Sequence, residues 1–275
     1  MNEPQKFGHS WTVQKLNAVE EYLKFYTTAL KNKSFNLCYI DAFSGSGNIT
    51  LKDGQIIDGS ALRALQYPFD AYYFFEKNEE YYTTLREKVE TSYSNKLEKI
   101  EIVNGDCNKL LNDIDQGTWT FENWRGVIFL DPYAMDLGWT SLEKISKTKI
   151  FDVWYLFPFS AVTRNLPNSG IIQQANEEKL TRIFGSSDWK QHIYQTSPQQ
   201  TLFDDLTNLE KIPNGLEDYL QKRLQETFPT VAPNPARLYN EKNSPLFLLC
   251  FAGSNPSIKA KRLSLKGANY ILNHV

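Results

Sequence analysis

The feature that most constrains this chain is an apolar run that breaks into a glycine-rich turn, Asn36-Leu-Cys-Tyr-Ile-Asp-Ala-Phe-Ser-Gly-Ser-Gly-Asn48. The segment from Leu37 to Ala42 predicts a buried strand, and Asp41 stands where that strand runs out. Gly45 and Gly47 let the backbone approach a ligand closely and adopt φ angles that other residues resist. The stretch therefore predicts a first strand that leads into a loop beneath a small-molecule cofactor, with a purely structural turn as the alternative.

Further apolar runs alternate with helical periodicity along most of the chain. Strands are expected at 71–75, 100–104, 126–130, 151–157 and 245–252, and helices at 11–30, 61–66, 79–91, 109–114, 139–148, 216–228 and 258–273. Short loops between alternating strands and helices indicate an α/β fold with a doubly wound, mostly parallel sheet. We expect one domain over residues 1–275, with a loose lead-in before residue 11 and a flexible flap at 48–58.

Composition excludes several classes of protein. The formal net charge of -2 gives no global basic signature for nucleic acid, although a local basic groove would not show in the total. The three cysteines are scattered, so neither a disulfide framework nor a metal site is expected. The polar start of the chain and the absence of a long apolar run predict a cytoplasmic protein without a signal peptide or membrane span.

Two acidic residues follow predicted strands directly. Glu76 comes after the second strand, where a carboxylate can accept hydrogen bonds from both hydroxyls of a ribose. A helix N-terminal acid is the structural alternative. Asp106 ends the third strand in a Gly-Asp pair that is equally typical of a turn.

The fourth strand ends in Asp131-Pro-Tyr-Ala134. This places a carboxylate at the carboxyl edge of the sheet, where open α/β folds keep their chemistry. Asp131 and the Pro132 carbonyl could accept the N–H groups of an amine on a nucleic-acid base, and Tyr133 offers a stacking face. An ordinary strand-terminal turn is the alternative.

Three other features have both a structural and a functional interpretation. Lys15, four residues after Trp11 on a predicted helix, is either solvated or reaches the carboxylate of a cofactor. Residues 160–215 form either a packing elaboration or a mainly helical insertion that recognises substrate. The basic C-terminal helix is usually a solvated face, and nucleic-acid contact is the less common interpretation.

The motifs together resemble the bacterial three-Cys-motif partner (TcmP) family. The resemblance covers nearly the whole chain and rests on Tyr39-Ile-Asp-Ala-Phe-Ser-Gly-Ser-Gly47, Phe74-Phe-Glu-Lys-Asn78, Gly105-Asp-Cys-Asn108, Phe129-Leu-Asp-Pro-Tyr-Ala-Met135 and Phe151-Asp-Val-Trp-Tyr-Leu-Phe-Pro158. The family looks like a class I methyltransferase dependent on S-adenosylmethionine (SAM). It implies a Rossmann-like sheet with an antiparallel C-terminal strand, and a partner protein with a three-cysteine motif.

The resemblance assigns roles by motif. The residues implied in cofactor binding are Lys15, Asp41, Phe43, Gly45, Gly47, Glu76, Lys77, Asp106 and Cys107, and those implied in catalysis are Asp131, Pro132 and Tyr133. The Asp-Pro-Tyr-Ala run lacks the second proline of the D-P-P-Y of adenine and cytosine amino-methyltransferases and is similar to the D-P-F-G of transfer-RNA guanine methyltransferases.

The function expected from the sequence is SAM-dependent methylation of an exocyclic amine on an RNA or DNA base. A non-catalytic SAM- or nucleotide-binding module that acts through its partner is the alternative from another class. An NAD-dependent Rossmann enzyme is the weakest interpretation, because the third glycine of the dinucleotide fingerprint is missing.

Overall fold

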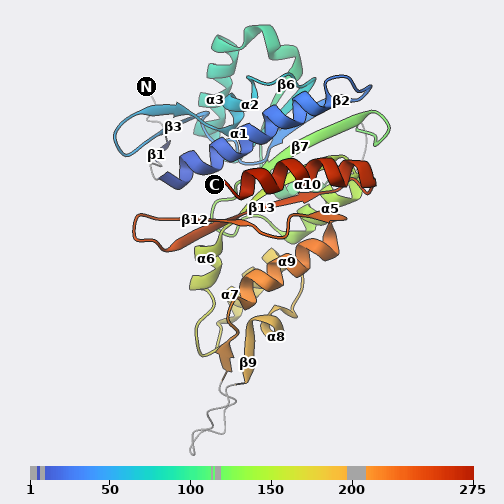
Figure 1. Ribbon diagram of the computed structural model, residues 1–275. Coiled ribbons are helices and arrows are strands. Elements are labelled where there is room, and N and C mark those ends of the chain that lie inside the picture. Colours follow the sequence, from blue (N-terminus) through green and yellow to red (C-terminus); the bar gives the residue numbers. More distant parts are fainter. Residues whose placement is uncertain (1–4, 7–9, 113, 115–118, 197–208) are drawn as a thin grey trace, which may run out of the picture.

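The computed structural model describes residues 5–6, 10–112, 114, 119–196 and 209–275. A twisted sheet crosses the molecule with helices on both faces (Figure 1). Its strands follow the order β11-β13-β8-β7-β2-β5-β6, and β12 also pairs with β13. The bounds are β2 (Asn36–Asp41), β5 (Ala71–Glu76), β6 (Ile100–Asn104), β7 (Trp124–Leu130), β8 (Phe151–Phe157), β11 (Thr230–Val231), β12 (Ala236–Tyr239) and β13 (Pro245–Gly253).

The direction of the strands confirms the predicted fold class. β6, β5, β2, β7 and β8 run parallel, β13 lies antiparallel to β8, and β11 and β12 lie antiparallel to β13. The carboxyl ends of the parallel strands therefore meet at one edge of the sheet. This is the Rossmann-like sheet of class I methyltransferases, mostly parallel with an antiparallel C-terminal strand.

Alternate residues of each central strand pack on opposite faces, as the period of a β-strand requires. Along β8, Val153 and Tyr155 pack on one face, where α4 (Cys107–Asn112), α5 (Trp139–Thr148) and α9 (Gly215–Thr227) lie. Trp154 and Leu156 point to the other face, covered by α1 (Ser10–Leu30), α2 (Ser60–Ala64), α3 (Glu79–Ser92) and α10 (Ile258–Leu272). Burial on both sides explains why these strands read as continuous apolar runs.

The segment at 48–58, for which a flexible flap is expected, forms a short hairpin. β3 (Asn48–Thr50) pairs antiparallel with β4 (Ile56–Asp58) and parallel with β1 (Gln5–Lys6). The Leu51 amide donates to the Gln55 carbonyl at 2.7 Å, which closes the turn. Such a hairpin needs few apolar residues, because its pairing with β1 satisfies backbone polar groups along its edge. Trp124, expected in a loop, is likewise the first residue of β7.

The region at 160–215 contains α6 (Phe159–Arg164), α7 (Gln174–Phe184), α8 (Trp189–Ile193) and an antiparallel pair, β9 (Tyr194–Thr196) with β10 (Leu209–Lys211). It lies below the sheet in Figure 1. The described part is mainly helical, as expected, and the small strand pair was not predicted. A 3-10 helix (Ser94–Lys99) precedes β6. The Phe203-Asp-Asp205 run, whose charges predict a loop, lies outside the described residues.

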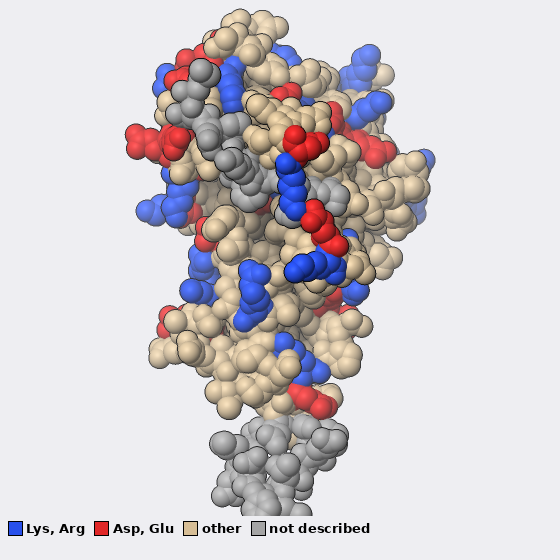
Figure 2. Space-filling view, turned by 90° about the vertical axis from the view of Figure 1, so that its left-hand side faces the viewer, with Lys and Arg blue, Asp and Glu red and all other residues tan. Residues whose placement is uncertain are grey.

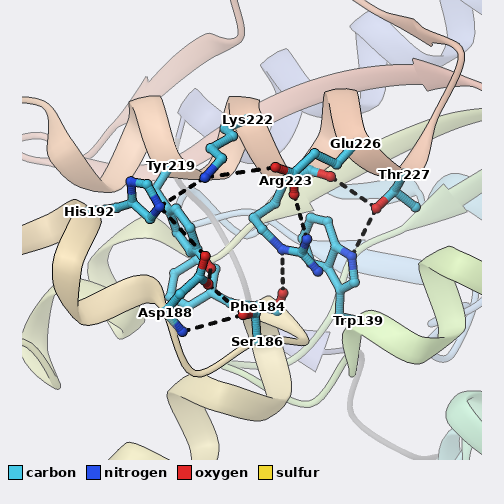
Figure 3. A network of polar contacts seen from close by, with 10 residues as sticks. All are labelled: Trp139, Phe184, Ser186, Asp188, His192, Tyr219, Lys222, Arg223, Glu226 and Thr227. Carbon is cyan, nitrogen blue, oxygen red and sulfur yellow. Dashed lines mark hydrogen bonds and ion pairs between the residues drawn. The ribbon is translucent and has the colours of Figure 1, made fainter.

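A polar network joins this region to α5 and α9 (Figure 3). Asp188 accepts hydrogen bonds from the hydroxyls of Ser186 and Tyr219, and Arg223 Nε donates to the Phe184 carbonyl at 2.9 Å. The His192 ring stacks on Tyr219 with centroids 4.9 Å apart. His192 therefore packs against Tyr219 and lies outside the cleft described below.

Candidate cofactor and substrate site

A cleft of about 950 Å³ opens at the carboxyl ends of β2, β5, β6 and β7, beside the first turns of α1. Its volume lies at the upper end of the roughly 300–1,000 Å³ typical of small-molecule sites, so it has room for more than one reactant. This edge of the sheet points left in Figure 1 and toward the viewer in Figure 2, where lysine and arginine side chains are spread across the middle of the face. The exposed Arg164 and Lys77 are two basic residues that line the cleft.

The glycine loop takes the backbone conformation expected from its sequence. Gly45 and Gly47 have φ angles of +62° and +87°, in the left-handed region that side chains disfavour. The Gly59 amide donates to the Gly47 carbonyl at 2.7 Å, and a Cβ on Gly47 would stand 2.9 Å from Leu85 Cδ1. The loop is therefore held between the hairpin and α3, with its backbone facing the cleft.

Glu76 fixes the same loop from the neighbouring strand. Its Oε2 accepts a hydrogen bond from the Gly45 amide at 2.8 Å, and its Oε1 accepts one from the Asn78 amide at 2.7 Å. A carboxylate has about four acceptor positions, so two stay available for a diol. Glu76 can therefore orient the loop and at the same time accept hydrogen bonds from the hydroxyls of a ribose.

Asp106 lies at the end of β6 as an ionised acceptor. Its Oδ1 accepts from the amide and the side chain of Asn108 at 2.9 and 3.0 Å, and its Oδ2 lies 3.6 Å from Lys77 Nζ. Partial burial alone would raise the pKa of Asp106, but the Asn108 hydrogen bonds and Lys77 bring it below its ordinary value. Cys107 lines the cleft as a neutral thiol, because burial raises its pKa to about 12.

Asn108 is a residue that the sequence interpretation did not single out. Its Nδ2 donates to the Asp136 carbonyl at 2.8 Å, and its Oδ1 accepts from the Gly138 amide at 2.8 Å and the Ser141 hydroxyl at 3.1 Å. One side chain thus joins the end of β6 to the loop that follows β7. Only its place in the Gly-Asp-Cys-Asn motif pointed toward it.

The structure brings Asp131 and Lys15 together although they lie 116 residues apart in sequence. Lys15 Nζ donates to Asp131 Oδ2 in an ion pair, and the side chains are only 8% and 21% exposed. Lys15 Nζ also lies 5.0 Å from the centroid of the Trp11 ring. The solvated alternative for Lys15 is therefore wrong, because its ammonium is buried against a carboxylate and an indole.

Asp41 lies behind this pair and does not line the cleft. It is 0% exposed, its Oδ1 accepts from the Phe43 amide at 3.2 Å, and its Oδ2 has no hydrogen bond with the described residues. Burial raises the pKa of Asp41 to about 7; the nearby Ser60 hydroxyl and the Lys15 charge lower it, and the Asp131 charge raises it. Phe43, by contrast, lines the cleft.

The remaining predicted residues lie at the rim of the cleft. Pro132 and Tyr133 both line it, and the Tyr133 side chain is exposed, with 76% of the residue accessible. Ala134 follows with a φ of +50°, which turns the chain sharply after the Asp-Pro-Tyr run. Tyr133 therefore presents its ring to the outside and not to the interior.

The described residues include neither a metal-binding cluster nor a membrane-spanning helix. No three His, Cys, Asp or Glu side chains among them lie close enough together to hold a metal ion. None of the described helices is both long enough and apolar enough to cross a membrane.

No family model and no curated protein matches the sequence. Similarity is found among solved structures. Protein LPL1258 from Legionella pneumophila, assigned to the family DUF519, matches with a TM-score of 0.54 and 15% identity over 97% of this chain and 94% of that one. This similarity shows that the two chains share one fold over nearly their whole length, with the Rossmann-like, class I methyltransferase-like sheet described above.

Weaker matches include the N-terminal domain of EvdMO1 solved with S-adenosylhomocysteine (SAH) bound, at a TM-score of 0.41, 8% identity and coverage of 85% of this chain and 79% of that one. Spermidine synthase from Thermotoga maritima matches with a TM-score of 0.42 and 10% identity, over 90% of this chain and 61% of that one.

Proposed function

We propose that this protein is a SAM-dependent methyltransferase that methylates an exocyclic amine of a nucleic-acid base. One observation carries the proposal: a single cleft is lined on one side by the glycine loop, Glu76 and Asp106, and on the other by Asp131 in its Asp-Pro-Tyr-Ala run. The first set suits a nucleoside cofactor and the second suits an amine.

The residues present fit SAM. The backbone of Gly45 and Gly47 would hold its methionine part, Glu76 its ribose and Asp106 its adenine amino group, with Phe43, Lys77 and Cys107 around them. The fit rests on Glu76 and Asp106, which both keep acceptor positions free of the hydrogen bonds described above. When bound, SAM supplies a methyl group on a positively charged sulfur.

Asp131 would act on the other reactant. Its carboxylate and the Pro132 carbonyl can accept the two N–H groups of an amine, which fixes the direction of the nitrogen lone pair. A carboxylate there also stabilises the positive charge that develops on the nitrogen. The exposed ring of Tyr133 offers a stacking surface for the base that carries the amine.

A nucleic-acid substrate is supported by the charges at the rim. Arg164 is exposed and lines the cleft, so it could neutralise a phosphate next to an inserted base. The formal net charge of -2 is compatible with this, because the basic groups are local. We also propose that the chain belongs to the TcmP family and works in the cytoplasm with a three-Cys-motif partner.

The ion pair between Lys15 and Asp131 favours a second candidate. If the pair never opens, the cleft binds SAM or a nucleotide without turnover, and the protein acts as a binding module through its partner. Unchanged cofactor binding with no methyl transfer to any RNA or DNA, even with the partner added, would support this candidate.

The first experiment is calorimetric titration of the purified protein with SAM, SAH and NAD. We expect binding of SAM and SAH but not of NAD, and loss of that binding in Glu76→Ala with the fold intact by circular dichroism. Asp131→Ala should abolish methyl transfer to RNA or DNA and should not weaken SAM binding by more than several-fold, because its carboxylate faces the amine. Absence of SAM and SAH binding in the wild-type protein would refute the proposal.

A further inference from the structure

The ion pair between Lys15 and Asp131 occupies the group that the proposed reaction needs. Lys15 reaches Asp131 Oδ2 from the second turn of α1, and the pair is largely buried. A target amine would have to donate to the same carboxylate. The two donors therefore meet at one carboxylate, of which Lys15 already engages Oδ2.

The competition between Lys15 and the amine is electrostatic. An ammonium beside Asp131 cancels the negative charge that should meet the positive charge developing on the target nitrogen. Removing Lys15 from Asp131 without a new partner would leave a nearly buried cation without a counter-charge, which is strongly unfavourable. Lys15 can therefore leave only when another anion is offered to it.

The cleft supplies a place for such an anion. Lys15 lines the same cleft as Gly45 and Gly47, whose backbone would hold the methionine part of the cofactor with its carboxylate. The other charged group that acts on this set is Asp41, which lies on β2 and whose pKa responds to both Asp131 and Lys15. Trp11, on the same helix as Lys15, keeps a favourable ring contact with its ammonium.

We propose that Lys15 is a positioning residue that switches from Asp131 to the carboxylate of the amino-acid part of the cofactor, so that cofactor binding frees Asp131 for the substrate amine. The switch rests on the proposed function. It implies that cofactor binds before substrate, and that Asp131 weakens cofactor binding in the free protein by holding Lys15.

The test compares two probes and four proteins by calorimetry. SAH carries the amino-acid carboxylate and a neutral sulfur, and 5′-methylthioadenosine has the same nucleoside and a thioether without the amino-acid group. The proteins are the wild type, Asp131→Asn, Lys15→Met and the double variant, each checked for folding by circular dichroism and thermal unfolding.

Asp131→Asn should bind SAH at least about fivefold more tightly than the wild type, because Lys15 is no longer engaged. Its affinity for 5′-methylthioadenosine should not change. In the Lys15→Met background the same Asp131→Asn change should give no gain in SAH affinity. This comparison distinguishes the release of Lys15 from a general loss of negative charge in the cleft.

Three results would overturn the inference. One is an Asp131→Asn variant that binds SAH no better than a SAH-binding wild type, which would leave the proposed function standing and make the ion pair merely structural. Another is a gain in affinity on Asp131→Asn that persists in the Lys15→Met background or is equally large for 5′-methylthioadenosine. A wild-type protein that binds neither SAH nor SAM would overturn the proposed function and the switch with it.

Discussion

Replacing Asp41 with asparagine tests the electrostatics at the floor of the cleft. Asp41 ends β2 with no exposed surface, and burial raises its pKa from the ordinary 3.8 to about 7. Asparagine has the same shape and can keep the hydrogen bond from the Phe43 amide, but it cannot ionise. The variant therefore removes a titration and little else.

The sign and size follow from linkage. A carboxyl group whose pKa is raised on folding stabilises the protein fully below its unfolded pKa, and this contribution is lost as the pH rises through the folded pKa. Between pH 4 and pH 7 the wild type should lose stability relative to Asp41→Asn by about 1.4 kcal/mol per pH unit, to a total of about 4 kcal/mol, since the pKa changes from 3.8 to about 7.

The assay is urea unfolding of both proteins at half-unit steps from pH 4 to pH 8.5. The difference in unfolding free energy should move steadily in favour of Asp41→Asn up to about pH 7. It should stay level above pH 7, because Asp41 of the wild type is then ionised in both the folded and the unfolded protein. Groups that titrate elsewhere cancel in the difference. A difference that is independent of pH would refute the reasoning, because Asp41 would then have the same pKa folded and unfolded.

Three further substitutions test packing and the network of Figure 3. Gly126→Ala places a Cβ 2.6 Å from Cys38 Sγ between strands and should lower the unfolding free energy by about 1–3 kcal/mol. Gly105→Ala is the control, because its Cβ meets Leu110 at an ordinary 3.4 Å and should be tolerated. Equal melting temperatures of the two variants would contradict this expectation. Two hydroxyl hydrogen bonds lower the pKa of Asp188, so its contribution is present above the unfolded pKa and is lost as pH falls through the lowered folded pKa. Asp188→Asn should thus lower the melting temperature at pH 7 and much less near pH 3, and an equal loss at both pH values would argue against that role.

The sequence predicted the central sheet closely because its strands are buried on both faces. The expected bounds of the strand at 151–157 and the helix at 139–148 coincide with β8 and α5. An apolar run with no polar interruption has few other ways to fold in water. The same physics placed Glu76, Asp106 and Asp131 at the ends of their strands.

The elements that the sequence did not predict are stabilised by partners far away in the chain. β11 and β12 are short and flank Pro233 and Pro235, and they become strands by pairing with β13. β9 pairs with β10, and β3 pairs with β1 and β4. Short segments of this kind carry little periodicity, so only their hydrogen-bond partners determine their conformation.

The sequence by itself determined the layered fold and the presence of acids along the carboxyl edge of the sheet. Both follow from periodicity and strand ends, which depend only on residues close together in the sequence. Only the tertiary structure decided what those acids contact. Lys15 meets Asp131 across 116 residues, Asn108 joins two loops, and Asp41 is buried beneath the cleft. Such contacts depend on the packing of α1 and the sheet, and a side chain's charge state follows from what surrounds it in space.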